Sequence, residues 1–352
     1  MTWPTVDGCE DHSPGCANCY AKREVYRLSF SSQPKVSTRY RGLTVLRDNG
    51  PQWTGVVREF PASLTIPLQR QTATTYFVNH RSDTFHHSVT SQYIMAMFGV
   101  MSLCPQHTFL VLTKRDDIMA NWHEVLARQE NTAVGSAVAA CINAANGFGV
   151  TMKARRKVRT VQLHTTWPLP NVYSGVTVEN TQHGIPRVAN LRRVPGKRFL
   201  SVEPQLEHLG VLDLRGIDCV IIGGESGPRA RPFDIVWARD IIAQCRAAGV
   251  QVFLKQVGAV PLDSSRAAVH QPCIHEGARA IRSTVYGADA PEVLQARIDA
   301  SDERLRLAAP TVETPIRLRD YFRYEHKKGG NPSEWPADLR DPAFRQTPWS
   351  TT

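Results

Sequence analysis

The sequence predicts an α/β fold, a (β/α)8 or partial TIM-type barrel, from two observations. Short, apolar, β-prone runs recur along residues 1–262, and each run ends in polar residues that a helical or loop segment follows. Near-continuous apolar strands separated by helices are typical of a parallel sheet covered on both faces. Eight such units in about 260 residues match the size of a barrel. A doubly wound open sheet is the second interpretation.

The expected elements follow one another in a regular order. Six strands are clear from their apolar runs: 75–78, 108–112, 172–178, 198–202, 219–222 and 250–254. Two further strands are expected at 2–6 and 62–68. Amphipathic patterns predict helices over 91–101, 116–127 and 233–248, and Gly249 follows the last helix as a C-cap. Polar residues after the strands would then line one mouth of the barrel, where enzymes of this fold carry their active sites.

Two segments interrupt this pattern. Residues 129–166 are expected to be an insertion, first rich in small residues and then strongly basic over 153–159. A lid, a nucleic-acid-contacting arm and a solvated excursion are the three interpretations. Residues 263–352 are expected to be a C-terminal extension, with an exposed helix over 291–308 and a turn-rich tail over 327–336 that packs on the barrel.

Composition restricts the class of protein. Of 352 residues, 42% are hydrophobic and 21% are charged, which is ordinary for a globular chain. No apolar run has membrane-spanning length and no signal peptide is visible, so a cytoplasmic location is expected. The formal net charge of +10 favours a polyanionic partner such as nucleic acid. In a reducing compartment a disulfide framework is not expected, so clustered cysteines indicate a metal or redox site.

Three of the 8 cysteines, Cys9, Cys16 and Cys19, lie on one short N-terminal loop. Three thiolates can ligate one metal centre and leave a coordination position open, which a catalytic site needs. His12 would instead complete a Cys3His zinc site. Gly8 and the residue before Cys16, another glycine, are expected to let the backbone approach the centre closely.

The loop resembles that of a radical S-adenosylmethionine (SAM) enzyme, and more closely that of an uncharacterised family often found in phage genomes. The likeness rests on Ser13-Pro14-Gly15-Cys16-Ala17-Asn18-Cys19-Tyr20. Further motifs of that family match residues 82–86, 112–115, 175–180, 201–204, 223–227, 255–256 and 329–336. Six residues separate Cys9 from Cys16, where the superfamily usually has three, and Asn18 replaces the usual aromatic residue. Both departures agree with the phage-associated family.

The resemblance implies a [4Fe–4S] cluster on the three loop cysteines, with SAM on the fourth iron and an electron donor as partner. The resulting 5′-deoxyadenosyl radical would abstract hydrogen from a nucleic acid or modified nucleobase. Phage DNA base hypermodification in an infected bacterial host is the expected function, and a target base would be flipped out of the duplex. Repair of damaged DNA, a non-catalytic zinc- or Fe–S-stabilised nucleic-acid-binding protein, and a barrel hydrolase or transferase with incidental cysteines are the alternatives.

The strand-end residues supply the remaining site. Ten are expected to contact the cofactor: Tyr20, Asn79, Ser82, Asp83, Lys114, Arg115, Glu179, Ser201, Gly223 and Gly224. Three are expected to act on the substrate: Glu203, Glu225 and Lys255. Carboxylates and bases of this set would alternatively form ion pairs inside the barrel. His86 and His87 are expected to be polar residues at a helix start, not metal ligands.

Overall fold

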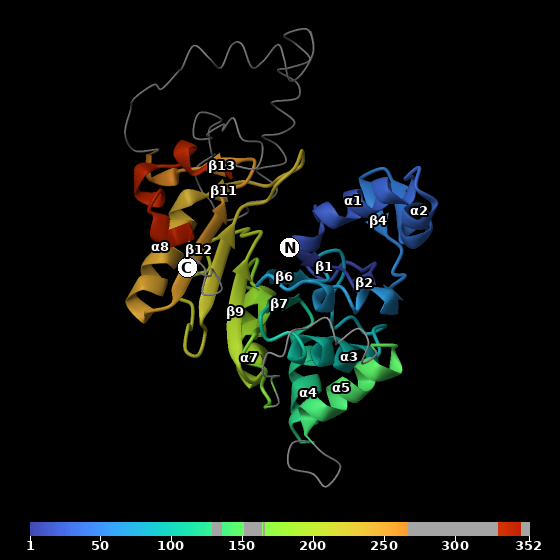
Figure 1. Cartoon of the computed structure of the whole chain (residues 1–352). Coiled ribbons are helices and arrows are strands. Elements are labelled where there is room, and N and C mark those ends of the chain that lie inside the picture. The colour runs from blue at the N-terminus through green and yellow to red at the C-terminus, as the bar shows by residue number, and fades with distance from the viewer. Residues whose placement is uncertain (129–135, 151–163, 165, 267–329, 346–352) are drawn as a thin grey trace.

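Seven strands form one parallel sheet at the centre of the structure (Figure 1). The computed structural model describes residues 1–128, 136–150, 164, 166–266 and 330–345. The strands, in spatial order, are β1 (Thr2–Trp3), β6 (Thr75–Val78), β7 (Thr108–Thr113), β8 (Val172–Thr177), β9 (Lys197–Val202), β10 (Cys219–Gly223) and β12 (Gln251–Gln256).

The spatial order of the strands decides between the two expected architectures. It follows the order of the chain, and every neighbouring pair is parallel. A doubly wound sheet reverses its strand order, so that interpretation is wrong. Within the described residues β1 and β12 each have one neighbour, so the sheet is a partial (β/α) barrel and not a closed one.

The eighth expected strand, at 62–68, is absent from the described chain. Two 3-10 helices occupy this region, η2 (Pro61–Ser63) and η3 (Pro67–Gln69). Each begins with a proline, which has no N–H to donate to a strand ladder. Leu64 and Leu68 are nevertheless buried, so their apolar character serves core packing without a sheet.

The expected first strand, 2–6, is also divided. Pro4 separates β1 from β2 (Val6–Asp7), and β2 pairs antiparallel with β5 (Arg58–Glu59) outside the main sheet.

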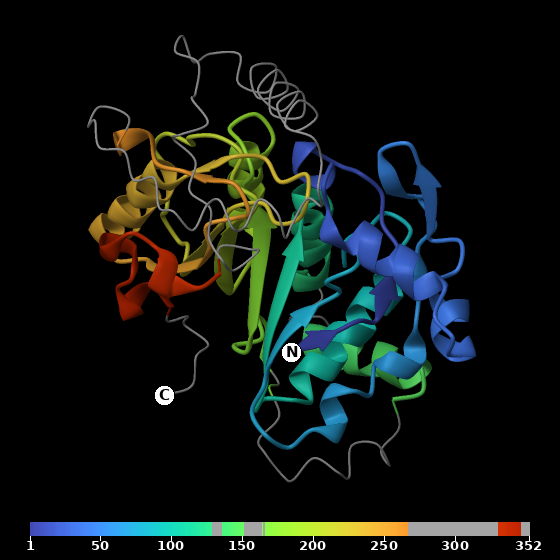
Figure 2. The same ribbon diagram turned by 90° about the horizontal axis from the view of Figure 1, so that it is seen from above.

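Helices cover the outer face of the curved sheet (Figures 1 and 2). They are α3 (Ser91–Ser102), α4 (Asp116–Ala127), α7 (Gly184–Arg193) and α8 (Ile235–Ala248). Thr90 accepts a hydrogen bond from the Tyr93 N–H at the start of α3, and Asp234 accepts one from the Val236 N–H at the start of α8. Gly249 ends α8 with a φ of +66°, which confirms the expected C-cap.

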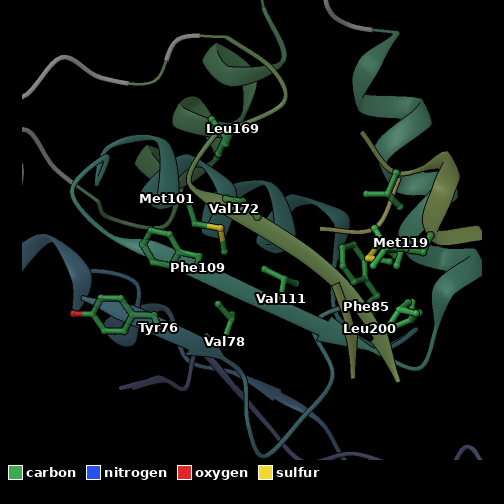
Figure 3. Close-up of a cluster of buried hydrophobic side chains, with 14 of the residues drawn as sticks. Tyr76, Val78, Phe85, Met101, Phe109, Val111, Met119, Leu169, Val172 and Leu200 are labelled. Carbon is green, nitrogen blue, oxygen red and sulfur yellow. The ribbon is translucent and has the colours of Figure 1, made fainter. Parts of the chain in front are cut away.

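Alternate residues of the strands pack on opposite faces of the sheet. Phe109, Val111 and Leu200 join the large outer core with the helices (Figure 3). Leu110, Phe199 and their neighbours form a smaller apolar cluster on the inner face. The sheet is therefore apolar on both faces, and polar residues are left to its carboxyl edge.

A small lobe lies beyond the β1 end of the sheet, on the right in Figure 1. It comprises α1 (Tyr20–Ser29), α2 (Pro34–Tyr40) and a hairpin of β3 (Thr44–Arg47) and β4 (Gly50–Trp53). The apolar pattern of the sequence did not predict this lobe. Because α1 begins directly after Cys19, the lobe fixes one end of the cysteine loop.

Part of the expected insertion is the helix α5 (Ala137–Gly147), which packs on α3. A Cβ at Gly99 of α3 would lie 2.2 Å from the Cys141 carbonyl oxygen, so the small residues permit close helix packing. The basic run 153–159 and the expected helix 291–308 lie outside the described residues.

The described part of the C-terminal tail packs on α8. It contains three 3-10 helices, η6 (Pro332–Glu334), η7 (Ala337–Leu339) and η8 (Pro342–Arg345). Trp335 is buried, and Arg239 of α8 forms an ion pair with Asp338 at 2.7 Å. A short parallel pair, β11 (Phe233–Asp234) and β13 (Pro261–Leu262), lies before α8 and after β12. Among the described residues, no helix combines the length and apolar character needed to span a bilayer.

Candidate functional site

The cysteine loop lies across the carboxyl edge of the parallel sheet. The Ser13 hydroxyl donates to Glu179, which follows β8, and the Asn18 amide donates to Glu225, which follows β10, at 2.9 Å. The Ser82 hydroxyl, beyond β6, donates to the Gly8 carbonyl at 2.6 Å. Three strand ends therefore hold the loop in place.

Glu179 is the more deeply buried of the two glutamate anchors, with 0% of its surface exposed. Besides Ser13, it accepts hydrogen bonds from Arg187 at 2.5 Å and from Lys114 at 3.4 Å. Burial alone would raise the pKa of Glu179, but Lys114, Arg187 and the hydrogen bond from Ser13 lower it to about 2. This side chain, expected to contact the cofactor, is an anion that anchors the loop.

Glu225 is the second anchor. Arg231 pairs with both of its carboxylate oxygens, at 3.0 Å through Nε and 2.6 Å through Nη2. Asn18 shares one of these oxygens. This residue, expected to be catalytic, therefore touches the cysteine loop directly.

The glycines before Glu225 are explained by close packing. A Cβ at Gly224 would lie 2.8 Å from Gly258 Cα, and a Cβ at Gly223 would lie 3.1 Å from the Glu203 carboxylate. The absence of side chains therefore lets β10 approach its neighbours at this edge.

Asp83 joins the end of β6 to the end of β7. Its carboxylate accepts hydrogen bonds from Thr113 Oγ1 at 2.6 Å, the Lys114 N–H at 3.1 Å and Arg115 Nη1 at 3.1 Å. Arg115 also donates to Glu10 of the cysteine loop at 3.1 Å. Both residues, expected to contact the cofactor, belong to a buried network that supports the loop.

Asn79 and Ser201 lie in the interior. Asn79 has a φ of +52°, and its side-chain oxygen accepts hydrogen bonds from the Thr5 and Val6 N–H groups at 2.9 and 3.0 Å. It holds the N-terminal strands β1 and β2 against β6. Ser201 is buried on β9, between outward-facing Leu200 and Val202.

Glu203 and Lys255 form a more open pair at the other end of the carboxyl edge. Their ion pair measures 2.9 Å, and Lys255 is 53% exposed. Gln256 donates a further hydrogen bond to Glu203 at 2.8 Å. Tyr20 is half exposed, and burial, followed by nearby Cys19, Glu24 and Glu203, raises its pKa. Glu203 therefore lies near Tyr20, the residue that directly follows the cysteine loop.

The three loop cysteines are half-buried, free thiols. Burial, supported by the Asp83 charge, raises the pKa of Cys9 to about 12, and burial also raises the pKa of Cys19. Negative charge on Cys16 would raise the pKa of Cys9 and of Cys19 further, so the three thiols lie near one another. Neutral thiols of this kind become thiolates when a metal cation supplies the opposing charge.

A family model matches residues 1–306, with the description "Protein of unknown function (DUF5131)". The chain belongs to the DUF5131 family. Neither the curated proteins nor the solved structures contain a match. The family match spans the cysteine loop and all the strand-end residues described above, but it assigns them no reaction.

Sequence reasoning missed the partners that anchor the loop in this DUF5131 protein. Ser13 and Asn18 belong to the loop motif, but no local pattern links them to their partners. Arg187 and Arg231 likewise carry no local signal of their ion pairs. Gly15 was expected to approach a metal centre. In the structure a Cβ there would lie 2.9 Å from Lys114 Nζ and 3.3 Å from the Glu179 side chain. Gly15 therefore lets the loop lie directly on its anchor.

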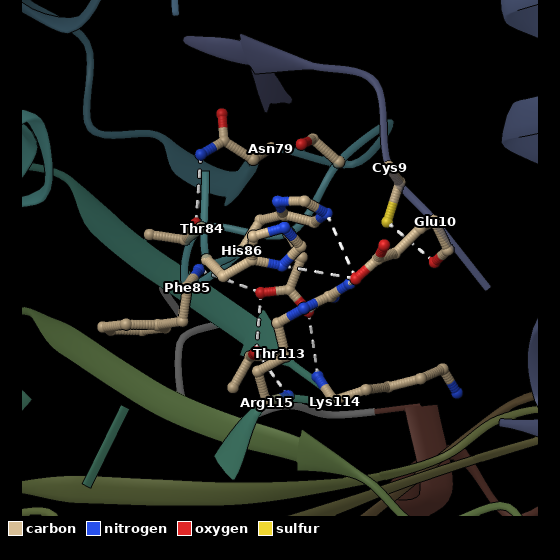
Figure 4. A network of polar contacts seen from close by, with 12 residues as sticks. Cys9, Glu10, Asn79, Thr84, Phe85, His86, Thr113, Lys114 and Arg115 are labelled. Carbon is tan, nitrogen blue, oxygen red and sulfur yellow. Dashed lines mark hydrogen bonds and ion pairs between the residues drawn. The ribbon is translucent and has the colours of Figure 1, made fainter. Parts of the chain in front are cut away.

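One group of possible metal ligands forms beside the loop: Glu10, His86 and His87. Figure 4 shows the Glu10 carboxylate beside the His86 ring. Glu10 Oε1 lies 3.6 Å from His86 Nε2 and 3.4 Å from His87 Nδ1. The Ser88 N–H donates to His86 Nδ1 at 3.1 Å, so a neutral His86 carries its proton on Nε2. That nitrogen then has no lone pair for a metal, which disfavours a site here.

Proposed function

We propose that this DUF5131 protein is a radical SAM enzyme that acts on a nucleic acid or a modified nucleobase. One observation carries the proposal. Three thiols share a loop that Glu179 and Glu225 anchor across the carboxyl edge of a parallel partial barrel. This edge is where barrels of this kind carry their active sites.

The donor set fits an iron–sulfur cluster better than a single zinc ion. A Zn–S bond of about 2.3 Å places the sulfurs of a tetrahedral ion within about 4 Å of one another. The three Sγ atoms do not all lie within 4.8 Å of one another, and His12 forms no ligand group with them among the described residues. A [4Fe–4S] cluster takes each thiolate on a different iron, so its ligands lie farther apart.

Cys9, Cys16 and Cys19 would hold the cluster. When bound, the cluster and SAM would supply one-electron cleavage of SAM to a 5′-deoxyadenosyl radical. The Lys114–Glu179 and Arg115–Asp83 pairs hold the loop and its surroundings rigid.

The open end of the edge would orient the substrate. The Glu203–Lys255 pair has both signs of charge at the surface. The inner apolar cluster around Leu110 and Phe199 would exclude water from the reacting group.

The net charge of +10 supports a polyanionic substrate. Modification of phage DNA bases, with rearrangement of a base substituent, is the reaction we favour. It would require a flipped-out base and an electron donor in the cytoplasm of an infected bacterium.

The test is anaerobic reconstitution with iron and sulfide, followed by reduction with dithionite and addition of SAM. We expect four irons per chain and formation of 5′-deoxyadenosine, both lost in Cys16→Ala. Cys104→Ala, which removes a buried thiol of the core, is the control and should retain both. Stoichiometric zinc without iron would refute the proposal and favour a zinc-stabilised nucleic-acid-binding protein.

A further inference from the structure

A small pocket opens beside the cysteine loop, at the N-terminus of α1. Its walls include Asn18 and Cys19 of the loop, Arg23 of α1, and Ser226 and Arg229 from the segment after β10. Of the expected site residues, only Cys19 lies in it. Cys19 is the link between this pocket and the proposed metal centre.

The two arginines of the pocket have no partner for their guanidinium groups in the part of the chain that the structure describes. Neither guanidinium group forms an ion pair or hydrogen bond with any residue in the described ranges. Lys22, in the same pocket, differs because it is buried against Asp11 at 2.7 Å and Gln52 at 2.8 Å. Five N–H donors on each arginine are therefore available to a ligand.

The start of α1 adds positive charge to the same place. No acidic residue lies in its first turn, and no side chain caps it with a hydrogen bond. Lys22 and Arg23 stand there instead, where the helix dipole is positive and acidic residues are favoured. An anion bound at this point would offset both the charge of the basic side chains and the positive end of the helix dipole.

Two glycine turns leave room for the guanidinium groups. A Cβ at Gly227 would lie 2.3 Å from Arg23 Nη2, and a Cβ at Gly50 would lie 3.1 Å from Arg229 Nη2. The two arginines approach the pocket from α1 and from the segment after β10. The fold therefore places both guanidinium groups against a glycine backbone, although the Arg229 side chain stays exposed.

We infer that this pocket binds a phosphate group of a nucleic-acid strand. Arg23 and Arg229 would each donate to its oxygens, and the Ser226 hydroxyl would donate a further hydrogen bond. Forked donors from two directions match an acceptor with several oxygens, which is the geometry of phosphate. The inference rests on the proposed function for the nucleic-acid class of the ligand. The net charge of +10 favours a nucleic-acid strand over a phosphopeptide.

The test measures binding of fluorescein-labelled single-stranded DNA to the reconstituted protein by anisotropy at several salt concentrations. Arg23→Gln and Arg229→Gln should each weaken binding about tenfold. Each should also reduce the slope of log affinity against log salt by about 0.7. Arg27→Gln, one turn further along α1 and exposed, removes the same charge and should change neither quantity appreciably. Because Arg229 is exposed, its replacement should not affect folding.

Three results would overturn the inference. Affinity equal to that of Arg27→Gln would show that the arginines do not contact the strand. Loss of iron with unchanged DNA affinity would show that they offset the charge of the metal centre instead. Stronger competition by a phosphoserine peptide than by unlabelled DNA would assign the pocket to a peptide. Since DNA binding is measured separately from 5′-deoxyadenosine formation, absence of that product would refute the proposed reaction without deciding the phosphate site.

Discussion

The two ends of the site differ in how their charges are satisfied. Glu179 and Asp83 are both buried and paired with cations, and Asp83 also accepts a hydrogen bond from the Lys114 N–H. Lys255 and Arg229 are exposed instead: Lys255 pairs with Glu203 near the surface, and the Arg229 guanidinium group forms no ion pair with any described residue. Charge at the buried end therefore maintains the position of the cysteine loop, whereas charge at the open end is accessible to ligands. It also explains why strand-end residues that look equivalent in the sequence need not share a role.

Glu179→Gln should have the largest effect on stability. The substitution leaves Lys114 and Arg187 facing a neutral amide in a buried site, which should lower the free energy of unfolding by about 3 kcal/mol. Glu203→Gln, at the open end, is the matched control and should cost less than about 1 kcal/mol. Urea unfolding at neutral pH measures both values, and equal losses would contradict the distinction.

The acid dependence of Glu179→Gln gives an independent check. The pKa of Glu179 is about 2 in the folded protein, below its ordinary value of 4.5. Its stabilising contribution is therefore fully present above about pH 4.5 and is lost as the pH falls toward 2. The difference in unfolding free energy between the unsubstituted protein and the variant should narrow over this range. A constant difference would show that Glu179 is not charged in the fold.

A smaller effect is expected when the two loop side chains that donate to the anchoring glutamates are removed. Ser13→Ala with Asn18→Ala deletes the hydrogen bonds to Glu179 and Glu225 but leaves both ion pairs, so stability should fall by about 2 kcal/mol. The reconstituted variant should lose iron to a chelator faster than the unsubstituted protein. Ser29→Ala, which removes only a local bond to the Tyr26 carbonyl in α1, is the control. Equal rates of iron loss would mean that the loop needs no anchoring.

The sequence predicted the strands of the sheet better than it predicted the site. Apolar runs placed six strands and the helix over 116–127, because burial on both faces leaves a clear local pattern. The prediction of a strand at 62–68 was wrong, because apolar composition alone does not separate a strand from two proline-initiated 3-10 helices packed on the core. Local pattern also cannot reveal partners that are far apart in the chain.

The anchors of the loop are such partners. Ser13 and Glu179 are 166 positions apart, and Asn18 and Glu225 are 207 positions apart. The carboxyl-edge rule for parallel strands predicted that these residues gather, but not which of them would pair. Whether a glutamate ends as an anchor or stays open depends on neighbouring cations such as Arg187 and Arg231, which only the folded chain brings together.

The smallest effect on stability is expected at Lys255, where an effect on the substrate can be separated from an effect on the fold. Lys255→Gln removes one half of an ion pair that is 53% exposed on the lysine side, so the free energy of unfolding should change by less than about 1 kcal/mol. If the open end orients the substrate, product formation from DNA should nevertheless fall, while iron content stays at the level of the unsubstituted protein. Glu179→Gln should instead lower stability and iron retention more than Lys255→Gln does. A Lys255→Gln variant that is destabilised as strongly as Glu179→Gln would place the two ends of the site in one structural network. Fully retained turnover would instead remove Lys255 from the substrate-facing side.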